Sequence, residues 1–178
     1  MKSCTPEEAH QYWAPTDRSV RLNEDCELYL QSTLPRIVVQ APTEIREAII
    51  FVTTLVEATR SDAFQGGFVW FRIFHVGVLN SYPLGWKTLE SIRIAGGDTR
   101  TLELAPAQIF DAHDETELKL FLLQSMLFGW NVLFLPEGFN CGVQSTSSQR
   151  WFFYSDRQID LDKIFEAFQH WSPTYETN

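Results

Sequence analysis

The side chains best suited to chemistry lie in a short acidic segment around a histidine. Asp111, His113 and Asp114 are followed by Glu115 and Glu117. An Asp-x-His spacing with adjacent carboxylates could bind a divalent metal ion. Acidic residues directly before a helix are also favoured by the helix macrodipole, and Asp114 with Glu117 has the spacing of a capping box. Because no second His or Cys lies within helical reach, we predict helix capping here and no metal site.

A second candidate site pairs a histidine with a cysteine. His75 lies in an apolar stretch, and Cys141 precedes Gly142. If the fold brings them together, the imidazole could act as base and the thiol as nucleophile. The alternative is structural, because a strand histidine usually bonds a core neighbour and a free cysteine packs as a small apolar residue. His75 with Cys141, or Asp111 with His113, therefore defines an alternative function as a small enzyme or ligand-binding domain.

Aromatic residues are concentrated in MLFGWNVLFLPEGFN and, after ten intervening residues, in WFFYSD. Large aromatic side chains fill cores and also anchor protein interfaces. Acidic residues flank these segments on both sides. We expect Trp130 and Trp151 to be exposed within a rim formed by Asp111, Asp114 and Asp160. Packing of both tryptophans in the core is the competing interpretation.

Familiar catalytic motifs are absent from the sequence. It contains no GxSxG, HExxH or P-loop pattern, and no GxGxxG after a strand. We therefore predict no cofactor, and binding without catalysis is favoured over an enzyme.

The elements that must position these residues are predicted from apolar periodicity. A stripe formed by Ile45, Ile49, Val52 and Val56 indicates a helix. The main helices are expected at 43–60, 114–129 and 160–171, with strands at 68–78, 130–135 and 150–155. Further expected elements are a short helix after Thr5, capped with Glu8, a strand at 36–40, a helix between Pro83 and Gly96, and a strand at 99–104.

The pattern predicts an α+β fold in one domain, with helices packed on a largely antiparallel sheet. The stretch 68–78 is apolar on both faces, which is typical of a central strand. We expect an N-terminal appendage at 1–35, the core domain at 36–172 and a loose tail at 173–178. The predicted buried residues are Ile49, Val52, Phe71, Ile73, Leu118, Phe121, Leu122, Val132, Phe134, Phe153, Ile164 and Phe168.

The overall charge limits the classes of partner. The net charge of −9 argues against nucleic acid and anionic lipid, and favours a basic protein partner. Cys4, Cys26 and Cys141 form no CxxC pair, and neither a signal peptide nor a membrane-spanning stretch is evident, so we expect a cytoplasmic protein. The predicted function is a small, acidic, aromatic-rich interaction module without catalysis, one form of which is an inhibitor or immunity-type protein that blocks a basic partner.

Overall fold

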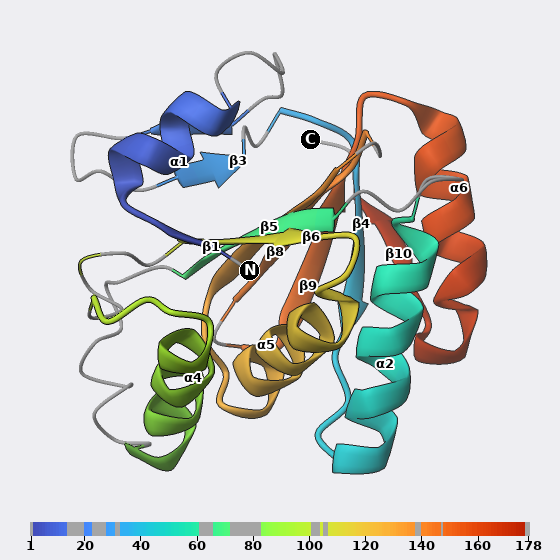
Figure 1. Cartoon of the computed structure of the whole chain (residues 1–178). Helices are drawn as coiled ribbons and strands as arrows, with labels where there is room; N and C mark the ends of the chain where they lie inside the picture. Colours follow the sequence, from blue (N-terminus) through green and yellow to red (C-terminus); the bar gives the residue numbers. More distant parts are fainter. Residues whose placement is uncertain are drawn as a thin grey trace.

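The computed structural model describes residues 2–13, 20–22, 28–30, 33–60, 66–71, 83–100, 104, 107–137, 140–146 and 148–176. These residues form one α+β unit in which helices pack on an antiparallel sheet (Figure 1). Its helices are α1 (Pro6–Trp13), α2 (Ile45–Ala58), α4 (Pro83–Ala95), α5 (Glu115–Leu127), α6 (Gln158–Ala167) and the 3₁₀ helix η3 (Gln169–Trp171). Its strands are β1 (Lys2–Cys4), β2 (Val20–Leu22), β3 (Leu28–Leu30), β4 (Arg36–Gln40), β5 (Gly66–Phe71), β6 (Ala107–Asp111), β7 (Val132–Pro136), β8 (Gly142–Ser145), β9 (Arg150–Tyr154) and β10 (Thr174–Glu176).

Eight of these strands form the main sheet, in the order β1-β6-β5-β7-β8-β9-β4-β10. Every described pairing within it is antiparallel, and β2 with β3 forms a separate hairpin. The central meander β7-β8-β9 follows the order expected from the sequence.

The two outermost strands come from segments expected to lie outside the core domain. β1 pairs with β6, with Ser3 opposite Gln108. β10 pairs with β4, with Tyr175 opposite Ile37. The predictions of a separate appendage and of a loose tail are therefore wrong for residues 2–4 and 174–176, because backbone hydrogen bonds add both segments to the sheet.

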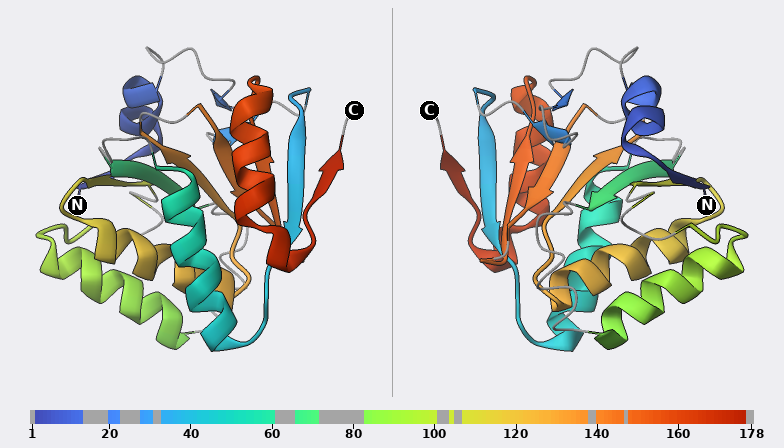
Figure 2. Two further views of the ribbon diagram at one scale, coloured as in Figure 1. Left: turned by 90° about the vertical axis from the view of Figure 1, so that its right-hand side faces the viewer. Right: turned by 90° about the vertical axis from the view of Figure 1, so that its left-hand side faces the viewer.

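One face of the sheet carries the main core. α2, α5 and α6 cover this face, and α4 packs beside α5 (Figures 1 and 2). Phe51 of α2 lies edge-on to Trp151, with ring centroids 5.7 Å apart, and to Phe168, at 4.9 Å. The expected alternation along β7 is confirmed, because Val132 and Phe134 enter this core while Leu133 and Leu135 face the other side.

The second face carries a smaller core beneath α1. Cys4, Ala9 and Leu135 belong to it. Farther along this face, Glu176 of β10 forms ion pairs with Arg36 and Arg150, each at 2.8 Å. Both guanidinium groups lie over the ring of Phe152, at 5.3 and 5.0 Å from its centroid.

The predicted core is largely confirmed. Val52, Leu118, Phe121, Leu122, Val132, Phe134, Phe153, Ile164 and Phe168 are buried. The predicted burial of Ile49 is wrong, because 49% of this residue is exposed. Ile73 and the side chain of Phe71 lie outside the described residues.

Two strand predictions differ from the structure in their bounds. β5 covers Gly66–Phe71 and lies between β6 and β7, so its interior place in the sheet is confirmed, whereas 72–78 lies outside the described residues. The strand expected at 99–104 is wrong for Thr99, Arg100 and Leu104; the strand in this part of the chain is β6, at Ala107–Asp111. Among the described residues, no helix has the length and apolar character needed to cross a bilayer.

Candidate functional site

An apolar groove lies between α2 and α5. The guanidinium of Arg60, just after α2, lies 3.7 Å from Glu115 in the first turn of α5, so the end of α2 lies beside the start of α5. A cavity of about 260 Å³ opens between them. It is lined by Ile49, Val52, Thr53, Thr116, Lys119, Leu120 and Leu123.

The sequence leaves this groove apolar because both helices carry more apolar residues than the core accepts. α2 turns Phe51 and Leu55 toward the sheet, which leaves Ile45 64% and Ile49 49% exposed. α5 buries Leu118, Phe121 and Leu122, while Leu120 on the opposite side is 43% exposed. An amphipathic helix of a globular protein normally presents polar residues on its outer side. The outer sides of α2 and α5 depart from this pattern where the two helices meet.

Charged residues at one end of the groove are already paired with one another. Glu115 accepts from Lys119 at 2.6 Å and also faces Arg60. The hydrogen bond from Lys119 holds the pKa of the Glu115 carboxyl below its ordinary value. The two positive charges beside the groove, Lys119 and Arg60, therefore share the single carboxylate of Glu115.

The predicted acidic segment lies at this same end. Asp111 ends β6 and is exposed, His113 is exposed, and Asp114 precedes α5. Asp111 accepts from the backbone N–H of His113 at 2.8 Å, and Asp114 accepts from that of Asp111 at 3.0 Å. These two hydrogen bonds stabilise the turn that precedes α5. The predicted capping box is wrong, because the side chain of Asp114 makes no capping bond to the helix.

The expectation of exposed tryptophans is wrong. Trp130 is 3% and Trp151 1% exposed. Trp130 stacks on Phe128 with ring centroids 5.4 Å apart, after a tight turn at Gly129. Trp151 points from the inner face of β9 into the core against Phe51. The competing interpretation, that both tryptophans pack in the core, is therefore confirmed.

Asp160 does not belong to an exposed rim either, because it is 3% exposed. α6 begins at Gln158, two residues earlier than expected, which places Asp160 in its first turn beside the sheet. Its carboxylate accepts from the hydroxyl of Ser155 and faces the guanidinium of Arg157, each at 3.5 Å. The negative charge of Asp160 thus stabilises the start of α6.

The alternative sites receive little support from the described residues. Cys141 is 2% exposed, and its thiol donates to the carbonyl of Gly142 at 3.6 Å. His75 lies outside the described residues. In the described part of the chain, no group of three His, Cys, Asp or Glu side chains could hold a metal ion, and this includes Asp111 with His113.

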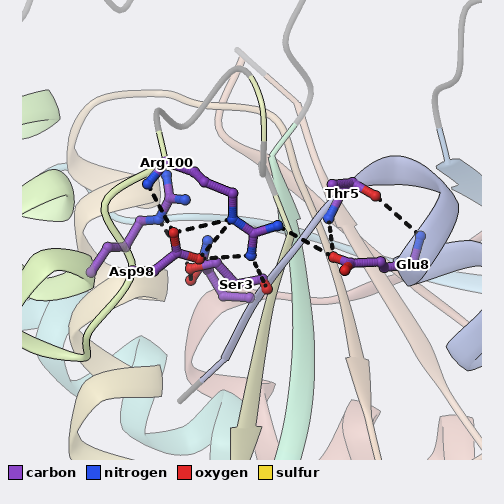
Figure 3. Close-up of polar contacts among 7 residues, drawn as sticks. Ser3, Thr5, Glu8, Asp98 and Arg100 are labelled. Carbon is purple, nitrogen blue, oxygen red and sulfur yellow. Dashed lines mark hydrogen bonds and ion pairs between the residues drawn. The ribbon is translucent and has the colours of Figure 1, made fainter.

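A polar cluster where β1 meets the loop after α4 was missed at the sequence level. Ser3 is buried; its hydroxyl donates to Gln108 at 2.8 Å and accepts from the buried Arg93 at 3.2 Å. Arg100 donates to both carboxylate oxygens of Asp98, to the carbonyl of Ser3 at 2.8 Å, and lies 3.5 Å from Glu8 (Figure 3). These bonds hold the pKa of the Asp98 carboxyl far below its ordinary value, chiefly through the guanidinium of Arg100.

The hydrogen bonds of this cluster hold β1 against the end of α4 and the loop that follows it. The expected capping box of α1 is confirmed, since Glu8 accepts from the N–H of Thr5 at 2.9 Å and the Thr5 hydroxyl accepts from that of Glu8 at 3.3 Å (Figure 3).

A polar cavity of about 430 Å³ opens beside Asp98 and Arg100. A hydroxyl nucleophile needs a base that removes its proton. The Ser3 hydroxyl instead donates to an amide oxygen, so the described geometry favours a structural role.

Sequence reasoning missed the groove because it assigned Ile49 to the core and made no prediction for Leu120. A signal was present, since Leu120, Leu123 and Leu127 follow one another at helical spacing beside the inner stripe of α5.

Comparison of the chain with protein-family models, with curated proteins and with solved structures finds no match.

Proposed function

We propose that this protein is a non-catalytic interaction module that binds a basic protein partner through the groove between α2 and α5. An inhibitor or immunity-type protein is one form of such a module. The observation that carries the proposal is the exposure of aliphatic side chains along the groove, Ile49 at 49% and Leu120 at 43%. Clustered exposed apolar residues with charged neighbours are typical of protein-binding surfaces.

Charge supports the choice of a basic partner. The chain carries a net charge of −9, and such a field accelerates association with partners of opposite charge. The buried thiols of Cys4 and Cys141 fit a reducing compartment such as the cytoplasm.

The proposal is tested by quantitative capture from native lysate of the source cells. The bait is the full chain, compared with the double variant Ile49→Asp/Leu120→Asp. The matched control is Ile94→Asp, because Ile94 is 55% exposed on α4, away from the groove. We expect a basic protein retained by the wild type and by the control, lost by the double variant, and released as salt rises.

Far-UV circular dichroism of each bait establishes that the fold is intact. Equal capture of the same proteins by all three baits would contradict binding through the groove. Capture that does not change between low and high salt would contradict the charge-based choice of partner.

A further inference from the structure

We infer that the occupant of the groove is a single amphipathic helix of the partner, with aliphatic side chains between α2 and α5 and Lys or Arg side chains beside Asp111. This inference rests on the proposed function and names the chemistry of the partner. It draws on the shape of the groove, its size and the distribution of charge around it.

The shape favours a helix. Two helices packed against each other leave a groove along their line of contact, and a third helix can fill it with residues spaced three and four apart. The walls repeat at this spacing, with Ile49, Val52 and Thr53 on α2. On α5 the wall is formed by Thr116, Leu120 and Leu123.

The size argues against two other occupants. A cavity of about 260 Å³ is slightly below the range of about 300–1,000 Å³ typical of small-molecule sites. A patch built on three partly exposed aliphatic side chains covers on the order of a few hundred Å². A stable dimer buries roughly 800 Å² per partner, and two copies of a chain with a charge of −9 would repel each other.

The charges around the groove indicate which charge the partner helix should carry. Residues 111–120 contain four carboxylates (Asp111, Asp114, Glu115 and Glu117) and one lysine. Lys119 and Arg60 both face Glu115, which leaves the acidic turn dominant at this end of the groove. A helix with basic residues beside its apolar stripe therefore complements this surface better than an acidic helix.

The test uses three synthetic helices of about four turns each. The first carries a leucine stripe with lysines on its flanks. The second has glutamate in place of every lysine, and the third has alanine in place of every leucine. Binding to the full chain is measured by fluorescence anisotropy, and the bound surface is mapped by amide chemical shifts.

We expect the basic helix to bind the wild type at least about tenfold more tightly than either other helix. Its chemical shift changes should lie on α2 and α5. Ile49→Asp/Leu120→Asp should weaken it by about tenfold or more, and Ile94→Asp should leave it unchanged. Asp111→Lys should weaken it several-fold at low salt, whereas Glu166→Lys, at an exposed position of α6, should not.

Equal binding of the basic and acidic helices, or binding that survives Ile49→Asp/Leu120→Asp, would overturn the inference. Concentration-dependent dimerisation in sedimentation, abolished by that double variant, would overturn it in favour of a second copy. If no helix binds while the double variant still loses its cellular partner, the helical occupant is refuted and the proposed function stands. If capture is also unaffected, both are refuted.

Discussion

Truncation of Phe168 to alanine should remove a central contact of the main core. Phe168 is the C-cap residue that follows α6, is fully buried, and lies against three aromatic rings. The ring centroids are 4.9 Å from Phe51, 5.0 Å from Phe153 and 5.6 Å from Trp171. Phe→Ala in a core costs about 3–5 kcal/mol, and each aromatic pair adds roughly 0.5–1.5 kcal/mol beyond the area it buries. Since one residue holds three such pairs, we expect a loss near the upper limit, about 5 kcal/mol.

The assay is urea unfolding followed by far-UV circular dichroism, with the loss read from the midpoint at an unchanged slope. Phe165→Ala is the matched control, because Phe165 lies on the same helix but is only partly buried and stacks on Tyr175. Domains have only about 5–15 kcal/mol of stability, so Phe168→Leu is measured as well to keep a folded variant. A loss below about 1 kcal/mol for Phe168→Ala, or one no larger than that of Phe165→Ala, would refute the packing argument.

Two further predictions concern pH. The guanidinium of Arg100 lowers the pKa of Asp98 in the folded state. The contribution of Asp98 to the free energy of unfolding is therefore present above its unfolded pKa of about 3.9 and is lost as pH falls below this value. Below this pH the stability of Asp98→Asn should fall less steeply than that of the wild type, and parallel curves of stability against pH would contradict the ion pair. Burial and the hydrogen bond to Asp162 raise the pKa of Tyr175 to about 12, so its contribution is present below about pH 10 and is lost as pH rises through the folded value. The difference between the ultraviolet titrations of the wild type and of Tyr175→Phe should show a phenol that ionises above pH 10. Ionisation near pH 10 would refute the hydrogen bond between Tyr175 and Asp162.

The helices and central strands were predictable because their signals are local. Periodic apolar residues identified α2 and α5, and alternation along β7 identified its two faces. The orientation of α2 was less well predicted. Ile45 and Ile49 fit a helical stripe as well as Phe51 and Leu55 do, but the larger phenylalanine fills the space between Trp151 and Phe168. A periodicity argument counts apolar residues and takes no account of the shape of the space that they must fill.

The features set by tertiary contacts were not predictable. Lys2–Cys4 is too short and too polar to read as a strand, and only pairing with β6 makes it one. The buried Arg93 reads as an ordinary charged residue near the end of a helix, because its neighbour Ser3 is 90 positions away. The burial of Trp130 and Trp151 likewise depends on how the helices cover the sheet.

The placement of β1 and β10 at the two edges of the sheet has a consequence for biosynthesis. Ser3 bonds a residue 105 positions later, and Arg36 bonds one 140 positions later. A ribosome therefore releases β1 and β4 long before it has made their partners. Unpaired strand edges recruit other chains, and nascent chains that expose them depend on chaperones. For this protein the edge of β4 that β10 covers stays open until residues 174–176 have been made, later than the segment that forms β9 on its other edge.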